Sequence, residues 1–292
     1  MSAARAERIL LILLGGVREF VRAAPAMAQI RQTHPAAQIT LLTTAPFQGL
    51  ARGSPWFNTV DAEGETNGFA ERMALIGRLR AMGLRRVYDL QGSAASRMIT
   101  SGVGFLGPKV SGAPRMDYPP PDLSWIVNSA PAERQLLRGP DRRAYALLIP
   151  GAAETPDPYQ WPSDRYAEIG RLLQKRGLDI FIAGGPKDSA VARTIQHKTP
   201  GARDMTGVTD FGRIALLAAR AEVVIGADCG LLHLAAATGA PTVVIYGVAV
   251  DPANIAPRGH VAVLHADNLN DLKAESVVHA VELLSPAGAR SA

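Results

Sequence analysis

Short apolar blocks alternate along the chain with longer segments of mixed composition. The blocks consist largely of Ile, Leu and Val in succession, without the alternation of apolar and polar residues that marks a strand with one solvated face. Such blocks are typical of parallel strands that are buried on both faces. We therefore predict strands at Ile9–Leu14, Gln38–Thr43, Arg86–Leu90, Ala144–Ile149, Asp179–Ala183, Val223–Gly226 and Thr242–Tyr246.

The segments between these blocks have the apolar spacing of amphipathic helices. The predicted helices are Glu19–Thr33, Gly68–Met82, Ser163–Arg176, Asp188–His197, Asp210–Arg220, Leu231–Thr238 and Leu272–Leu284. Regular alternation of strand and helix predicts doubly wound α/β units with right-handed crossovers.

The alternation stops between about Gly107 and Arg143, where proline and glycine recur in PPPD, APAERQ and GPDRR. These residues disfavour regular elements, so we predict a partly packed connection without helices or strands. A glycine-ended strand, Ala144–Gly151, then restarts the pattern, which argues against one large sheet. The prediction is two Rossmann-like domains, 1–138 and 139–292, that face a central cleft.

Composition adds limits to this picture. The net charge of +5 over 292 residues suggests mild affinity for anions, but without a run of Lys or Arg it gives little support for a nucleic-acid partner. The lone cysteine, Cys229, excludes an intramolecular disulfide and a Cys-rich zinc site, and it fits a reducing, cytoplasmic location. No apolar run approaches the roughly 18 residues that span a bilayer.

The apolar run ILLILLGGV at residues 9–17 has two interpretations. It resembles the core of a signal peptide, and it also fits a first buried strand that ends in a glycine turn. Arg18, Glu19 and Arg22 interrupt the run before any cleavage site, which favours the strand.

The segment GADCGLLHLAAATGAPTVVIYG, residues 226–247, carries the densest candidate chemistry. Asp228 to Gly230 is predicted to be the turn between a strand and a helix, where backbone N–H groups can hold a phosphate and His233 lies one turn further on. Asp228 could equally cap the helix, and His233 could equally be hydrogen-bonded inside the fold.

Two other interpretations of this cluster are weak. A metal site would need further ligands at suitable spacing, and neither an HxxxH nor an HxH pair occurs. A Cys229 nucleophile with His233 as its base would need an orienting third group, which is not evident.

The same segment resembles the signature of the family 9 glycosyltransferases, the lipopolysaccharide heptosyltransferases and their relatives. The similarity lies in Asp228-Cys229-Gly230, His233, Gly239–Pro241 and Tyr246-Gly247. Other stretches match the family in order: Ile9–Ala26, Pro35–Leu42, Tyr88–Ser93, Ile149–Gly151 with Trp161-Pro162, Gly184–Asp188, and Thr206-Gly207. The resemblance implies a GT-B fold and a nucleotide-diphosphate sugar donor, which is ADP-heptose in the best-known members, with no metal or other cofactor.

The resemblance also implies roles for individual residues. The donor side would comprise Gly151, Ala152, Ala153, Tyr159, Asp188, Gly207, Thr209, Asp228, Cys229, Gly230 and His233. The acceptor side would comprise Gly16, Arg18, Gln91 and Ser93. Asp188 would accept hydrogen bonds from the ribose hydroxyls, although an N-cap role suits it as well.

Four positions depart from the family pattern. Tyr159 stands where members usually carry a lysine that stabilises the leaving diphosphate, and Ala152-Ala153 replace small hydroxyl residues. Arg165, His233 or Lys187 could supply the missing charge. Glu19 takes the place of the aspartate that serves as general base, and its alternative role is pairing with the helix dipole.

We therefore expect an inverting transferase that moves a heptose-like sugar from a nucleotide-diphosphate donor to a lipid-linked saccharide, with peripheral contact at the inner membrane face. Loss of the lysine and of the hydroxyl pair motivates an alternative, a catalytically degenerate nucleotide-sugar-binding protein on the same fold. A weaker alternative is an epimerase or hydrolase of the sugar nucleotide.

Overall fold

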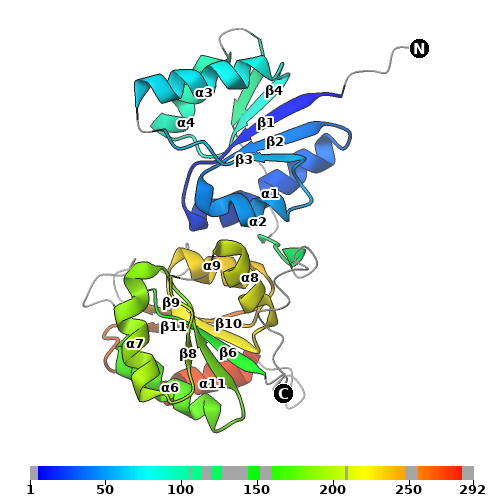
Figure 1. Ribbon diagram of the computed structural model, residues 1–292. Helices are drawn as coiled ribbons and strands as arrows, with labels where there is room; N and C mark the ends of the chain where they lie inside the picture. The colour runs from blue at the N-terminus through cyan, green and yellow to red at the C-terminus, as the bar shows by residue number, and fades with distance from the viewer. Residues whose placement is uncertain are drawn as a thin grey trace. The chain divides into compact units, whose positions relative to one another are not determined.

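A computed structural model describes residues 6–66, 68–104, 107–112, 120–126, 144–151, 160–207, 210–247 and 256–284. The chain divides into two compact units, Met1–Pro121 and Asp122–Ala292, which are described one at a time (Figure 1). The boundary predicted from the sequence, between residues 138 and 139, lies outside the described residues.

The first unit is built on a parallel sheet with the strand order β3-β2-β1-β4-β5. Its strands are β1 (Arg8–Ile12), β2 (Gln38–Leu42), β3 (Thr59–Asp61), β4 (Arg86–Asp89) and β5 (Lys109–Gly112). Its helices are α1 (Val17–Thr33), η1 (Ala45–Phe47), α2 (Gln48–Arg52), α3 (Phe69–Ala81) and α4 (Ala94–Gly104). Helices α3 and α4 cover one face of the sheet, and α1 and α2 cover the other (Figure 1).

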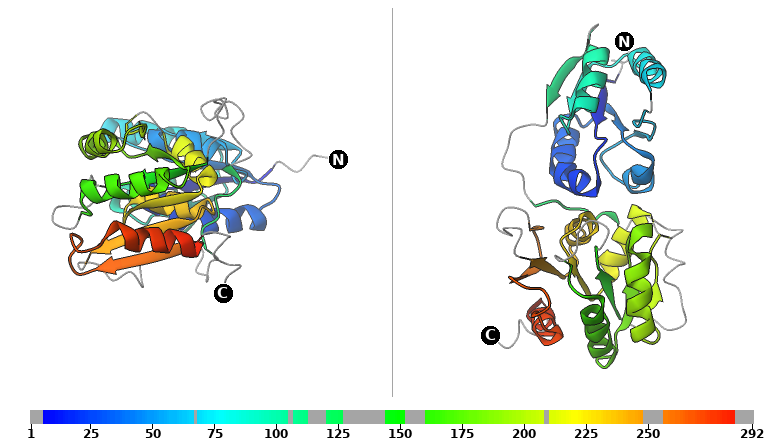
Figure 2. Two further views of the ribbon diagram at one scale, coloured as in Figure 1. Left: turned by 90° about the horizontal axis from the view of Figure 1, so that it is seen from below. Right: turned by 90° about the vertical axis from the view of Figure 1, so that its left-hand side faces the viewer.

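The second unit has a parallel sheet of order β11-β10-β9-β6-β7-β8. Its strands are β6 (Tyr145–Ile149), β7 (Asp179–Ile182), β8 (Arg203–Asp204), β9 (Val223–Ala227), β10 (Thr242–Gly247) and β11 (Val261–Ala266). Its helices are α6 (Ser163–Gln174), η3 (Pro186–Asp188), α7 (Ser189–Lys198), α8 (Phe211–Arg220), α9 (Gly230–Ala237) and α11 (Ala274–Leu284). Helices α6, α7 and α11 share one core with the sheet, while α8 and α9 contact each other on the opposite face (Figure 2).

Every strand and helix predicted from the sequence is present, with ends that differ by one or two residues. The apolar blocks are buried as expected: Ile9 to Ile12, Ala146 to Ile149 and Val224 to Ile225 are wholly enclosed. Strands β3, β5, β8 and β11 and helices α2 and α4 were not predicted.

The segment from Gly107 to Arg143 is not free of regular structure, contrary to the prediction. Strand β5 lies in it and pairs with β4 in parallel register, Val87 opposite Val110. Proline and glycine did not prevent this strand because its edge position demands few hydrogen bonds. Further along, the Leu123 N–H donates to the Ala237 carbonyl at 2.7 Å, so part of the connection packs on the second unit as expected.

The parallel arrangement positions the candidate chemistry. All strands of a unit end at one edge, so the loops that follow them gather there, next to the starts of the helices. In the described parts of the chain, no helix combines the length and the apolar character needed to cross a bilayer.

Candidate functional site

A hydrogen-bonded cluster occupies the start of α9 in the second unit. His233 Nε2 lies 3.0 Å from Asp228 Oδ1, and the Tyr246 hydroxyl donates to the same oxygen at 3.2 Å. Asp228 follows β9, His233 lies in the first turn of α9, and Tyr246 is near the end of β10. The neighbouring strand ends thus bring a carboxylate, an imidazole and a hydroxyl together at the start of a helix, and these groups can bond to a hydroxyl-rich ligand.

The structure can be compared with the alternative roles that the sequence suggested for His233 and Asp228. His233 is 6% exposed and bonded to Asp228, as expected for a histidine satisfied inside the fold. Cys229, rather than Asp228, occupies the N-cap position of α9. Tyr246 was quoted from the sequence only as part of a motif, and its contact with Asp228 could not be read from spacing, because they lie 18 residues apart.

Two glycines allow the loops around this cluster to approach closely. Gly151 has a φ of +63°, and a Cβ there would lie 3.1 Å from the Cys229 sulfur. Gly226 pairs with Ile149 across β9 and β6, and a Cβ there would lie 2.1 Å from the Ile149 carbonyl oxygen. A side chain at Gly151 would therefore push the loop after β6 away from the start of α9, and one at Gly226 would push β6 and β9 apart.

Cys229 is 1% exposed and packs against Gly151. A thiol buried in this way is poorly placed to attack a substrate, and the ring nitrogen of His233 bonds to Asp228 instead. Within the described ranges, no three His, Cys, Asp or Glu side chains are grouped as metal ligands.

A second group of predicted donor residues lies after β7. Asp188 is buried, and its Oδ2 accepts the Gly185 backbone N–H at 2.8 Å, which closes the turn into η3. Gly207, with a φ of +70°, donates its N–H to the Gly184 carbonyl at 3.0 Å. The sequence motifs at Gly184–Asp188 and Thr206-Gly207 are therefore neighbours in space.

Tyr166 of α6 is a buried side chain near both groups. Its side chain is fully buried and stacks edge-on against Trp161, with ring centroids 4.7 Å apart. Burial raises the pKa of Tyr166 well above its usual range, the nearby Cys229 and Asp188 raise it further, and the Ala227 backbone N–H acts in the opposite direction. The hydroxyl therefore stays neutral in the folded protein, and sequence reasoning did not identify this residue.

The candidate replacements for the family lysine have different surroundings. Arg165 pairs with Glu168 at 2.9 Å and also donates to the Asn270 carbonyl. Lys187 lies exposed in η3. Four predicted donor residues, Ala152, Ala153, Tyr159 and Thr209, lie outside the described residues.

The predicted base and acceptor-side residues lie in the first unit, on the adjacent loops after β1 and β4. Glu19 is exposed in the first turn of α1, and its Cγ would lie 3.0 Å from a Cβ at Gly15. The Gln91 amide nitrogen would lie 3.4 Å from the same point, and Gln91 Oε1 accepts the Leu14 N–H at 2.7 Å. Glu19 and Gln91 therefore meet over Gly15, with Gly16 and Arg18 in the same loop.

Asp89 organises the second of these loops, a role that the sequence motif did not reveal. The buried Asp89 accepts the N–H groups of Gln91 at 3.1 Å and Gly92 at 2.8 Å through Oδ1. Its Oδ2 accepts the Ser96 hydroxyl at 2.9 Å, and Ser93 Oγ accepts the Ser96 N–H at 3.1 Å, which caps α4. Gln91 and Ser93 are thus fixed by a carboxylate that is itself enclosed.

Two doubly wound α/β units with glycine-rich loops at the carboxyl ends of parallel strands define the GT-B class that the sequence predicts. The model of glycosyltransferase family 9 (heptosyltransferase) matches residues 68–281, more than half of the chain, and the chain belongs to this family. The match includes the loops that carry Asp89 and Asp228 and begins after Glu19.

Relatives and solved structures agree with this assignment. The lipooligosaccharide heptosyltransferase 2 of Haemophilus ducreyi is 30% identical over 120 residues, covering 39% of this chain and 34% of the relative. The structure of Escherichia coli ADP-heptose lipopolysaccharide heptosyltransferase II has a TM-score of 0.79 at 20% identity, covering 95% of this chain and 98% of that chain. An E. coli heptosyltransferase solved with ADP has a TM-score of 0.76 at 19% identity, covering 95% and 100%.

The two kinds of similarity differ in extent. The match to the curated relative spans about a third of that protein's length, whereas the structural likeness extends over nearly all of both chains. The GT-B fold expected from the sequence is confirmed by that likeness.

Proposed function

We propose that this protein transfers a heptose-like sugar from a nucleotide-diphosphate donor, ADP-heptose, to a hydroxyl of a lipid-linked saccharide, with inversion at the anomeric carbon. The observation that carries the proposal is the cluster of Asp228, His233 and Tyr246 at the start of α9. It provides hydrogen-bonding side chains beside the N-terminus of a helix, which favours negative charge.

The donor diphosphate would lie against the N–H groups at the start of α9, with His233 as a further donor. In its protonated form the His233 ring carries a hydrogen on both nitrogens, so Nδ1 can donate to an anion while Nε2 donates to Asp228. The fold shared with a heptosyltransferase solved with ADP supports a nucleotide diphosphate at this edge. Asp188 and Gly207 would border the nucleoside.

Glu19 would act as the general base. Its carboxylate takes the proton of the acceptor hydroxyl while that oxygen bonds to the anomeric carbon from the face opposite the diphosphate. The bond between the anomeric carbon and the diphosphate oxygen breaks at the same time, so the configuration inverts and the nucleoside diphosphate leaves. No metal or organic cofactor takes part in this scheme.

A lipid-linked acceptor would bring the protein to the inner face of the cytoplasmic membrane as a peripheral protein. The names of the curated relatives, which are lipooligosaccharide and lipopolysaccharide heptosyltransferases, support an acceptor of this kind.

The deciding experiment compares transfer and donor binding in two variants. Glu19→Gln is expected to lower kcat by roughly 100-fold or more while leaving the donor Kd nearly unchanged. His233→Ala is expected to weaken donor binding by roughly tenfold, because a charge-assisted hydrogen bond contributes about 1.5 kcal/mol or more. Transfer is measured with ADP-heptose and a delipidated saccharide, and binding by calorimetry.

Glu71→Gln is the matched control for Glu19. Glu71 stands three residues after the N-cap glycine of α3, as Glu19 does in α1. If pairing with the helix dipole were the whole role of Glu19, the two variants would lose similar stability and keep full transfer. His279→Ala on α11 is the control for His233.

The same assays separate the alternatives. Tight donor binding without transfer to any saccharide tried would support the degenerate binding protein. Consumption of the donor in the absence of acceptor, with an epimer or a free sugar as product, would support the epimerase or hydrolase.

A further inference from the structure

Three large apolar side chains of the first unit are exposed on neighbouring helices. Phe69 is 75% exposed and Met73 is 42% exposed on α3, and Met98 is 49% exposed on α4. We call these three residues the apolar patch. Side chains of this size left open to water carry a cost unless something covers them, so their position needs an explanation.

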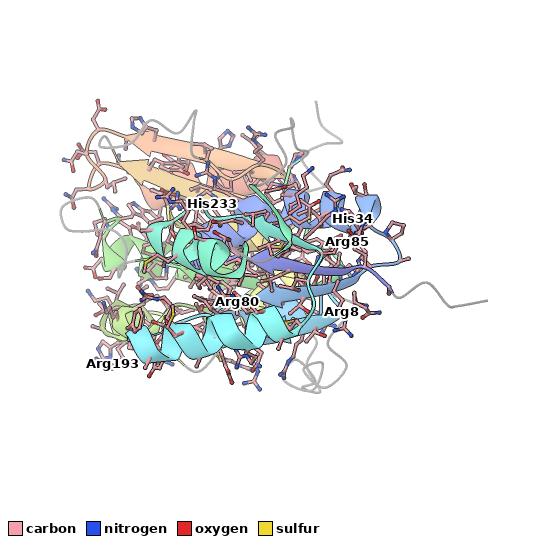
Figure 3. All side chains as sticks on the ribbon, turned by 90° about the horizontal axis from the view of Figure 1, so that it is seen from above. Arg8, His34, Arg80, Arg85, Arg193 and His233 are labelled. Carbon is pink, nitrogen blue, oxygen red and sulfur yellow. The ribbon has the colours of Figure 1, made fainter. Side chains whose placement is uncertain are left out.

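The apolar patch lies along the seam between α3 and α4. Phe69, Arg72 and Met73 are spaced by three and four residues, which puts them on one side of α3. Arg72 Nη1 reaches the Met98 sulfur of α4 at 3.6 Å. The seam is tight further along, where a Cβ at Gly102 would lie 2.6 Å from Ile76. Figure 3 looks onto these two helices, with Arg80 labelled.

Cationic side chains flank the apolar patch. Helices α3 and α4 carry Arg72, Arg78, Arg80 and Arg97 against a single acid, Glu71. Arg78 is paired with Asp61 and Glu63, and Arg80 donates to the Gly102 carbonyl of α4. The face therefore combines the apolar side chains with Arg72, Arg80 and Arg97, next to the acids Glu65 and Glu71.

We propose that the apolar patch and its flanking arginines dock the first unit onto a bilayer that contains anionic phospholipid. Phe and Met side chains would enter the boundary between headgroups and acyl chains, and arginines would meet the phosphates. Three apolar side chains are far fewer than the roughly 20 residues that each partner contributes to a stable protein interface. A bilayer surface, in contrast, can accommodate a small face that carries both apolar and cationic side chains.

This surface lies close to the proposed acceptor side. Met98 is five residues beyond Ser93, and both α3 and α4 begin at the carboxyl edge of the sheet, where Gln91 and Ser93 are fixed by Asp89. One part of the inference rests on the proposed function: a docked patch would present the loops that carry Gln91 and Ser93 to a lipid-linked acceptor.

The test measures partition of the full chain onto vesicles of phosphatidylcholine with and without phosphatidylglycerol. We expect binding to the anionic vesicles, weakened by salt. The triple variant Phe69→Gln, Met73→Gln, Met98→Gln is expected to lose at least roughly tenfold in partition, since each apolar group withdrawn from the interface removes part of the binding energy. Leu283→Gln, 68% exposed on α11, is the matched control and is expected to bind normally.

A labelled variant gives an independent readout. Because Cys229 is buried, an environment-sensitive fluorophore can be attached at Met73→Cys, with Leu283→Cys as the comparison. Anionic vesicles are expected to shift the emission of the first label to the blue and leave the second unchanged.

Unchanged partition of the triple variant, or absence of wild-type binding to anionic vesicles, would overturn the inference. So would a wild-type dimer in solution that the triple variant breaks, because the patch would then seat a second copy. Transfer to a delipidated saccharide is expected to be equal in wild type and triple variant. A wild type that binds vesicles through the patch but transfers no sugar would refute the proposed function and leave the docking surface standing.

Discussion

At the scale of single residues, one carboxylate oxygen organises the candidate donor site. Asp228 Oδ1 serves both the His233 ring and the Tyr246 hydroxyl. With Asp228 ionised, the Nε2–H of His233 donates to it, so the ring orientation is fixed and Nδ1 is held in a defined direction. A donor phosphate would then meet a preorganised side chain instead of a mobile one.

Removal of the Tyr246 hydroxyl should loosen this arrangement. Tyr246→Phe is expected to weaken donor binding by roughly threefold to tenfold, because one neutral hydrogen bond contributes about 0.5–1.5 kcal/mol. Combined with His233→Ala, the loss should be smaller than the sum of the two, since both act through Asp228. Calorimetry measures the affinities, and Tyr88→Phe in the first unit is the control. Additive losses would show that Tyr246 acts elsewhere.

At the scale of elements, the sequence patterns predicted the internal strands of each sheet but not the edge strands. The predicted strands are the internal ones, β1, β2, β4, β6, β7, β9 and β10. The missed strands β3, β5, β8 and β11 are the four edges. An internal parallel strand is buried on both faces and reads as an apolar block, whereas an edge strand such as Lys109–Gly112 is short and mostly exposed.

Helix α4 was missed for a related reason. Its sequence, AASRMITSGVG, is rich in Ser, Thr and Gly, which have weak helix propensity. Packing of Ile99 and Val103 on the sheet and the Ser93 cap stabilise it, and neither is visible in a local pattern. Likewise, the motifs located the donor-side loops, but the contacts of Asp228 with Tyr246 and of Asp89 with Ser96 required the fold.

The pairing of β9 with β6 should not tolerate a side chain at Gly226. Gly226→Ala is expected to lower the free energy of unfolding by about 2–3 kcal/mol, because the added Cβ would overlap the Ile149 carbonyl. Gly77 on α3 has open space around its Cα, so Gly77→Ala should raise the free energy of unfolding by about 0.5–1 kcal/mol. Urea denaturation checks both, and a neutral Gly226→Ala would show that the strands can separate.

Two buried tyrosines should limit the stability of the second unit at high pH. Burial raises the pKa of Tyr145 on β6, opposed by Arg220, and burial raises the pKa of Tyr166 on α6. Both stay neutral in the folded chain while the unfolded chain ionises near pH 10. Below about pH 10 the full stability of the folded chain is present, because both tyrosines are neutral in both states. Above that pH the free energy of unfolding falls by up to about 1.4 kcal/mol per pH unit for each tyrosine.

Urea denaturation between pH 9 and pH 11 measures this decline. Tyr166→Phe is expected to make the decline shallower, because one of the two groups no longer ionises on unfolding. A Tyr166→Phe variant with the wild-type slope would mean that the hydroxyl ionises equally in both states.

At the scale of the whole molecule, each unit contains one side of the proposed reaction. Every described donor-side residue lies in the second unit, and Glu19, Gln91 and Ser93 lie in the first. Each unit has its own sheet and core. Binding of the donor and transfer of the sugar should therefore be separable properties.

The second unit alone should bind the donor. A chain of residues 122–292 is expected to fold and to bind ADP-heptose with a Kd within roughly tenfold of the full protein, because the cluster at α9 is complete in it. It should transfer no sugar, even when mixed with residues 1–121. Calorimetry and circular dichroism check the first point, and loss of binding in a folded fragment would show that the first unit supplies donor contacts.

The division into two continuous stretches also fixes an order of events during biosynthesis. Residues 1–121 leave the ribosome first, and the 171 residues that follow take roughly 10–35 s at ordinary rates of translation. For that interval the nascent chain exposes Phe69, Met73 and Met98 with no donor machinery yet made. If the apolar patch docks on the membrane as proposed, the nascent chain can bind there before its donor-binding unit is synthesised. Membrane localisation would then precede transferase activity.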